Sequence, residues 1–122
     1  MIGGAHAIIF CTDPVRAREF FRDVLGFDAV DAGDGWLIFK LPPAELAMHA
    51  GSVEDGHESR HELYLMCHDL DQTIAELEAR GVEFVGEISV QRWGRLARFR
   101  VPGAGEIGLY EPAHPSPLPE FQ

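Results

Sequence analysis

Residues 6–13 read HAIIFCTD, and residues 62–69, 56 positions later, read ELYLMCHD. Both stretches keep the alternating apolar positions, the cysteine and the final aspartate. A second pair of segments, residues 40–49 and 100–110, also corresponds, with one additional glycine in the later copy. The chain is therefore predicted to contain two related units of about fifty to sixty residues, a length typical of structural repeats. Because two such units would face each other, we expect the functional site to lie between them.

The alternation in the repeated stretches predicts a strand at the start of each unit, and each strand leads into a helix. Asp13 followed by a proline is typical of a helix start, and the helical spacing of apolar residues continues to Gly26. Asp69 with Gln72 resembles a capping box, and that helix is expected to end at Gly81. Both units therefore begin with a strand and a helix.

Short strands are expected after each helix. In the first unit they cover residues 27–31, 36–41 and 45–49, and in the second unit residues 82–90, 96–101 and 106–110. Each unit thus reads βαβββ. The predicted fold class is α+β, with two βαβββ modules whose curved mixed sheets enclose a cavity.

The domain organisation follows from the same pattern. We expect a single domain over residues 1–112, with modules at about residues 4–50 and 61–112 and a polar connector between them. Residues 113–122 form a proline-rich C-terminal tail, expected to lie extended on the surface or on a partner.

The composition is that of a globular protein, with 46% hydrophobic and 25% charged residues among 122. Twenty acidic residues against ten basic ones give a formal net charge of −10, which repels phosphate backbones and anionic lipid surfaces. We therefore expect neither a nucleic acid nor a membrane as partner, and the charge favours basic ligands. No apolar run approaches the ~18 residues of a membrane span, and no basic signal peptide is recognisable, so a cytoplasmic location is expected.

Three further patterns are expected to be structural. Cys11 and Cys67 occupy matching places and are predicted to be buried, reduced thiols. The GxGxxG match at residues 103–108 is predicted to be a turn into a strand, because a dinucleotide-binding fingerprint must open a helix. The remaining histidines of connector, strand edge and tail are expected to be solvated: His57, His61, His68 and His114.

From residue 4 to about residue 112 the chain resembles the vicinal oxygen chelate superfamily, which includes glyoxalase I, bleomycin-resistance proteins and extradiol dioxygenases. The resemblance rests on His6 seven residues before Asp13, the FF…LGF helix ending at residues 20–27, and the DLD, RGVEF and IGLYEP segments. Some of these segments are similar to small bacterial members of the superfamily. The resemblance implies the two-module fold and a homodimer.

In such families a divalent metal is held by a His or Glu at the head of each first strand and a carboxylate in each last strand. The first-strand positions are His6 and Glu62, but the last-strand positions fall on Ala47 and Gly108, which carry no ligating group. Recruiting His49 to complete a site for Fe, Ni, Zn or Mn would move a side chain by about 6.6 Å, against metal bonds of about 2.0 to 2.2 Å. A hydrogen-bonded pair of His6 and Glu62 is the alternative, and no cofactor is then expected.

The two small residues leave room for a small organic ligand between aromatic and apolar walls. The alternative is that the aromatic residues fill a closed core. The expected ligand-binding residues are His6, Ile8, Phe10, Trp36, Ala47, His49, Glu62, Tyr64, Met66, Gly108 and Tyr110.

These residues favour a protein that binds or sequesters a small aromatic or cationic molecule without a catalytic metal, similar in kind to the bleomycin-resistance branch. The alternative is a metal-dependent extradiol dioxygenase or a glyoxalase-like lyase or isomerase, in which Glu62 or His49 would move a proton. A metal-free enzyme that uses one of these two residues as general base is a third hypothesis. The sequence leaves open whether the chain is an enzyme, which ligand it takes, and whether the cavity forms within one chain or across a dimer.

Overall fold

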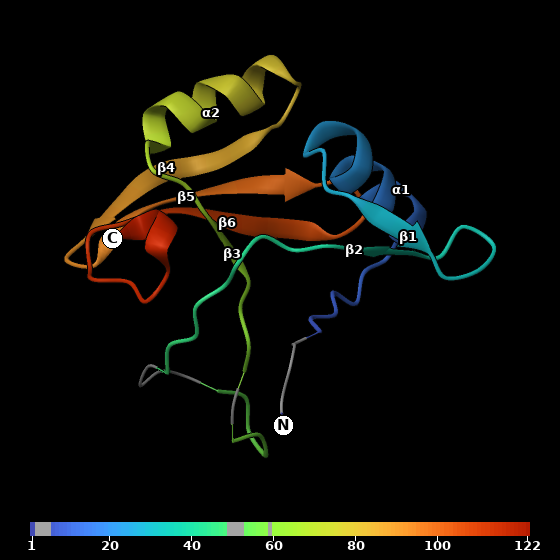
Figure 1. Cartoon of the computed structure of the whole chain (residues 1–122), viewed down its shortest axis with the longest axis horizontal. Helices are drawn as coiled ribbons and strands as arrows, with labels where there is room; N and C mark the ends of the chain where they lie inside the picture. The colour runs from blue at the N-terminus through green and yellow to red at the C-terminus, as the bar shows by residue number, and fades with distance from the viewer. Residues whose placement is uncertain (2–5, 49–52, 59) are drawn as a thin grey trace. The chain divides into compact units, whose positions relative to one another are not determined.

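The computed structural model describes residues 1, 6–48, 53–58 and 60–122 (Figure 1). The chain divides into two compact units. The first contains residues 1–40 and 100–106, and the second contains residues 41–99 and 107–122.

The helix of the first unit begins where the sequence predicts. The Asp13 carboxylate accepts a hydrogen bond from the backbone N–H of Arg16, 3.2 Å away, and a proline occupies the first turn of α1 (Pro14–Glu19). The helix continues as a π-helical turn, η1 (Phe20–Val24). Gly26 follows the helix end, with a φ of +74° that glycine adopts without steric cost.

A β-hairpin follows in the same unit. Strand β1 (Ala29–Asp31) pairs antiparallel with β2 (Leu37–Phe39), and the Asp31 carboxylate accepts the N–H of Gly33 in the connecting turn at 2.8 Å. The Phe21 ring packs between two other rings of this unit, with centroids 5.7 Å from Phe27 and 5.8 Å from Phe39. The aromatic side chains therefore join the helix to the hairpin.

Two strands expected in the first module are not formed by the described residues. Residues 6–11 and 41–48 have no regular secondary structure, and His49 lies outside the described residues. Ile8 and Phe10 are 65% and 92% exposed. A strand exists only where a neighbouring strand completes its hydrogen bonds, and alternation in the sequence does not supply that neighbour. The first module thus shows the helix and one hairpin of the predicted order.

The second unit follows the predicted βαβββ order. Its elements are β3 (Tyr64–Met66), α2 (Leu70–Ala79), β4 (Phe84–Gln91) and most of β5 (Gly94–Val101) and β6 (Gly105–Pro112); residues 100–106 belong to the first unit. The strands form one sheet in the order β3-β6-β5-β4, with β3 parallel to β6 and β4 antiparallel to β5. Figure 1 shows α2 lying over one face of this sheet. The chain is an α+β protein, as predicted.

The core of the second unit lies between α2 and the sheet. Leu70 and Phe99 are completely buried, and Ile107 and Leu109 are 5% and 3% exposed. Cys67 is also buried, which raises the pKa of its thiol, while Cys11 is half-buried. Both cysteines are free; the predicted burial is confirmed for Cys67 and is wrong for Cys11.

The start of α2 is fixed by carboxylates from two directions. Asp69 accepts the N–H of Gln72 at 3.1 Å, and Glu111 from β6 accepts the N–H of Leu70 at 3.0 Å. Arg95 from β5 is 3.0 Å from Asp71 in the first turn. These contacts satisfy backbone N–H groups that the helix itself leaves unpaired, and they place one face of the sheet against α2.

The GxGxxG segment is a turn followed by a strand, as predicted. Gly103 has a φ of +81°, and its carbonyl accepts the N–H of Asp13 at 3.0 Å within the first unit. Strand β6 begins at Gly105. The tail after β6 ends in a 3-10 turn, η2 (Pro119–Phe121), rather than remaining extended throughout. Among the described residues, no helix combines the length and the apolar character that crossing a membrane requires.

Gly103→Ala should destabilise the protein more than Gly105→Ala. Both positions have positive φ, so each substitution carries a backbone penalty of about 1 kcal/mol. At Gly103 the new methyl group would also overlap the Asp13 backbone and lie 2.7 Å from its Cβ, whereas nothing lies within 4 Å at Gly105. We expect Gly103→Ala to cost at least about 1 kcal/mol more in urea unfolding. Equal losses would contradict the close approach of the helix start to the turn.

Candidate ligand-binding site

The parallel pairing of β3 with β6 determines which side chains share a face of the sheet. Tyr64 is registered with Gly108 and Met66 with Tyr110, so these residues lie on one face. Their neighbours point to the opposite face, where Glu111 reaches the start of α2. The face that carries Tyr64 and Tyr110 is therefore the one away from α2, as predicted, and we call it the open face.

The position of Gly108 on the open face is covered by the Tyr64 ring. A Cβ atom built on Gly108 would overlap that ring and would lie 3.1 Å from Leu96 Cδ1. Gly108 itself is buried. The space left by the missing side chain is thus filled from the neighbouring strand, and the glycine allows the ring to lie close against the backbone of β6.

Glu62 precedes β3 and forms a charged cluster with residues on either side. One carboxylate oxygen accepts a hydrogen bond from Arg60, and the other accepts one from the Tyr64 hydroxyl. The Tyr64 hydroxyl, followed by Arg60, holds the pKa of Glu62 below its usual range. Partial burial, together with the Glu62 charge, raises the pKa of Tyr64. Glu62 is therefore an ionised carboxylate whose oxygens are already engaged.

Tyr110 is the centre of an aromatic cluster. Its ring centroid lies 6.4 Å from Tyr64 and 5.4 Å from Trp93, both at steep interplanar angles typical of edge-to-face packing. The His114 ring is 5.7 Å away, and its Nε2 is hydrogen-bonded to the Tyr110 hydroxyl. Burial, followed by the charge of Glu45, raises the pKa of Tyr110. The cluster joins β6, the β4–β5 turn and the C-terminal tail.

A second carboxylate, Glu45, lies beside this cluster. Its Oε2 accepts a hydrogen bond from the Ser116 hydroxyl at 2.6 Å, and its Oε1 is 3.5 Å from Nε2 of His114. The side chain of Glu45 is only 16% exposed, and Ser116 is 8% exposed. An acid, a hydroxyl and aromatic rings thus meet at one place in the second unit.

Sequence reasoning did not identify Glu45, Trp93, His114 or Ser116 as site residues. The prediction that His114 is solvated is wrong, because its ring is bonded to Tyr110 and is 31% exposed. For His114 and Ser116 the available signal was their position within six residues of Tyr110. Glu45 precedes Ser116 by 71 positions, and only folding joins them.

The other predicted site residues lie in different places. Met66 is half-buried in β3, and Ala47 is exposed in a segment without regular structure. His49 lies outside the described residues. The remaining predicted residues belong to the first unit, where all four are exposed: His6, Ile8, Phe10 and Trp36.

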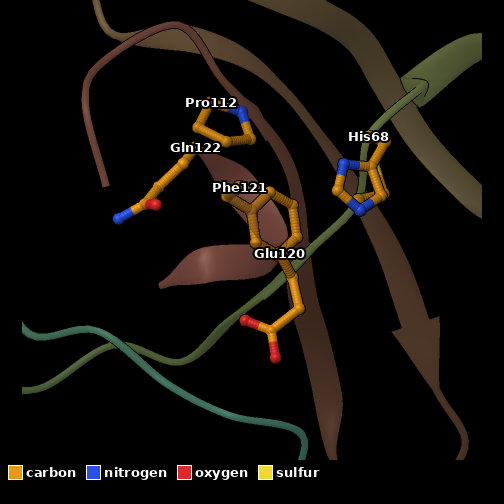
Figure 2. A pocket seen from close by; sticks show the side chains of 6 residues that line it. His68, Pro112, Glu120, Phe121 and Gln122 are labelled. Atoms are coloured by element: carbon orange, nitrogen blue, oxygen red, sulfur yellow. The ribbon is translucent and has the colours of Figure 1, made fainter. Parts of the chain in front are cut away.

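A small hollow near the tail shares no lining residue with the aromatic cluster (Figure 2). Its volume is about 140 Å³. The Phe121 ring stacks on His68 with a centroid distance of 4.4 Å and an interplanar angle of 16°. The lining residues are Cys67, His68, Pro112, Glu120, Phe121 and Gln122.

Two of the four positions that the resemblance assigns to metal ligands carry no ligating side chain in this chain. Ala47 and Gly108 offer no ligating side-chain atom, and the guanidinium of Arg60 at the Glu62 carboxylate opposes a divalent cation by charge repulsion. In the ranges that the structure describes, no group of three or more His, Cys, Asp or Glu side chains is arranged to hold a metal ion.

Comparison with known proteins identifies the family of the chain. Residues 4–113 match the sequence profile of the Glyoxalase/Bleomycin resistance protein/Dioxygenase superfamily. The chain belongs to this superfamily. The resemblance drawn from the sequence is confirmed.

Relatives of the chain span most of its length. It is 28% identical over 100 residues to the uncharacterized protein YetH of Bacillus subtilis (strain 168), covering 75% of this chain and 83% of YetH. A superfamily member from Sphaerobacter thermophilus DSM 20745 is 26% identical with a TM-score of 0.60, over 90% of this chain and 98% of that one. The antibiotic binding protein TnmS3 from Streptomyces sp. CB03234 is 24% identical with a TM-score of 0.57, over 93% and 100% of the two chains. The likeness to TnmS3 shows the fold alone.

Gly108→Ala should destabilise the protein by about 1–3 kcal/mol, because the new methyl group would displace the Tyr64 ring. In a Tyr64→Ala background the same substitution should cost much less. The measurement is a double-mutant cycle by urea unfolding, with an expected coupling of at least about 0.5 kcal/mol. Additive losses would contradict the packing of the ring on the glycine.

Tyr64→Phe should raise the pKa of Glu62, because it removes a hydrogen bond to the carboxylate and keeps the ring. A lowered folded-state pKa stabilises the protein above the unfolded-state value and ceases to do so as the pH falls through the folded-state value. The variant should therefore lose about 1 kcal/mol or less at pH 7, and the difference should shrink below about pH 4.

The measurement is an NMR titration of the Glu62 carboxyl together with unfolding at both pH values. Tyr110→Phe is the matched control, since the Tyr110 hydroxyl is bonded to His114 and not to Glu62. An unchanged Glu62 titration in Tyr64→Phe would show that the hydroxyl does not stabilise the charged form.

Proposed function

We propose that this protein binds or sequesters a small aromatic or cationic molecule on the open face of its second unit, without a catalytic metal. The observation that carries the proposal is the aromatic cluster of Tyr64, Tyr110 and Trp93 beside the carboxylate of Glu45. Aromatic faces and a little-exposed acid are the groups that attract a flat or positively charged ligand.

Charge supports the same class of ligand. The formal net charge is −10, which raises the local concentration of cations around the protein. Superfamily members include proteins named for resistance to bleomycin, and TnmS3, which shares the fold, is an antibiotic binding protein. A fold by itself does not determine function, so the residues of the cluster have to carry the argument.

The ligand contacts that the sequence predicts in the first unit remain predictions: His6, Ile8, Phe10 and Trp36. We further propose that the protein is a homodimer in which a second copy covers residues 6–10. The support is the exposure of Ile8 and Phe10, at 65% and 92%, which is costly for apolar side chains next to each other in a short segment.

Calorimetric titration with a panel of basic aromatic compounds and their neutral and acidic isosteres tests the binding function. The basic compounds should bind saturably and the acidic ones should not. Glu45→Gln should weaken binding about tenfold, the effect of about 1.4 kcal/mol from one charged hydrogen bond. Glu78→Gln, which makes the same charge change on exposed α2, is the control and should have no effect.

Elemental analysis of the untreated protein separates this function from the metal-dependent one. Stoichiometric Fe, Ni, Zn or Mn that resists dialysis would contradict the proposal and would favour the dioxygenase or glyoxalase-like chemistry. The absence of saturable binding by every basic compound would also overturn it.

Phe10→Asp tests the homodimer, because a charge at the covered surface should oppose association. The native protein should have the mass of a dimer by light scattering and the variant that of a monomer. Val90→Asp, at another exposed apolar position, is the matched control and should leave the mass unchanged. A monomeric native protein would rule out the second copy.

A further inference from the structure

The C-terminal tail folds back against the second unit and supplies one of the rings of the aromatic cluster. The N–H of Ala113 donates to the Trp93 carbonyl at 2.8 Å, which holds the start of the tail beside the β4–β5 turn. At its other end Phe121 stacks on His68 (Figure 2). The tail is therefore attached on both sides of His114. Its prolines restrict the undocked tail, so less conformational entropy is lost when it packs against the sheet.

His114 makes polar contacts with both of its ring nitrogens. Nδ1 is 2.7 Å from the Pro115 carbonyl oxygen, which accepts a hydrogen bond from it. Nε2 is bonded to the Tyr110 hydroxyl and is 3.5 Å from Oε1 of Glu45. A heteroaromatic ring with a basic nitrogen thus lies between a carboxylate, a phenol and an aromatic face.

The groups around His114 are organised by contacts of their own. Ser116 donates to Glu45 at 2.6 Å and accepts the N–H of Leu118 at 3.1 Å, so the carboxylate is held in place on the side away from the imidazole. Trp93 packs against Tyr110, with ring centroids 5.4 Å apart. This arrangement is preorganised for one flat ring that carries an N–H or N⁺–H group.

We propose that His114 is an internal occupant of a ligand subsite formed by Glu45, Tyr110 and Trp93, and that the subsite accepts the basic nitrogen heteroaromatic ring of an external ligand. The inference rests on the proposed function and narrows its ligand to compounds with an imidazole-like or pyridine-like cation. The external ring replaces His114, donates an N–H to the Glu45 carboxylate and stacks near Tyr110. The tail consequently competes with the ligand, and binding requires its release from the cluster.

Removal of the internal ring should create a site for free imidazole. In His114→Ala, imidazole should bind saturably and at least tenfold more tightly than in the native protein. The readout is the fluorescence of Trp93 in a Trp36→Phe background, where no other tryptophan remains. His57→Ala, which removes an exposed histidine from another loop, is the matched control and should behave like the native protein.

Glu45→Gln in the His114→Ala background tests the carboxylate. Imidazole binding should weaken about tenfold, because the acceptor of the charged hydrogen bond becomes neutral. If His114→Ala does not fold, as judged by circular dichroism, the native protein is titrated with imidazole and the ring protons of His114 are followed by NMR. They should shift toward the values of the unfolded tail as imidazole saturates.

Imidazole binding in His114→Ala that is no tighter than in His57→Ala would overturn the inference, as would binding that is indifferent to Glu45→Gln. In the native protein, His114 ring protons that do not move would overturn it as well. These results are independent of the ligand panel. If basic compounds bind the native protein but imidazole does not bind His114→Ala, only the proposal that His114 occupies a ligand subsite is contradicted. If imidazole binds His114→Ala but no compound of the panel binds the native protein, the proposed binding function is contradicted and the subsite proposal is supported.

Discussion

The short parallel ladder between β3 and β6 is the constraint on which the candidate site depends. Three residue pairs set its register, and that register places Tyr64 opposite Gly108 and Met66 opposite Tyr110. Because Gly108 has no side chain, the Tyr64 ring lies against the backbone of β6 and approaches Tyr110. A shift of β3 by one residue would turn Tyr64 toward α2, where Leu109 and Phe99 fill the core.

The charged residues on the two faces of the sheet have different partners. On the face toward α2, carboxylates and Arg95 pair with each other and with the first N–H groups of the helix, so the charges there stabilise the fold. Glu45 is hydrogen-bonded to Ser116 of the tail, and on the open face Glu62 is bonded to the Tyr64 hydroxyl and to Arg60. Under the proposed function, an external ligand would replace one of these internal partners.

The accuracy of prediction from sequence varied between the two modules. Local signals were sufficient for the helices, because the caps at Asp13 and Asp69 and the glycines that end the helices act over a few residues. Alternation was sufficient for the faces of β3 and β6. It failed for residues 6–11, where the pattern predicts a strand and the described structure contains none. A strand needs a partner, and pairing is not a local property.

The sequence by itself determined the family, the α+β order of the second unit and the excess of acidic charge. These are properties of residue identity and of short spacings. Only the tertiary structure decided that the Tyr64 ring covers Gly108, and that Glu45, Ser116 and His114 meet beside Tyr110. The physical reason is distance along the chain: Glu45 and Ser116 are 71 positions apart, and contacts of that span arise from how the chain returns on itself, which no local pattern records.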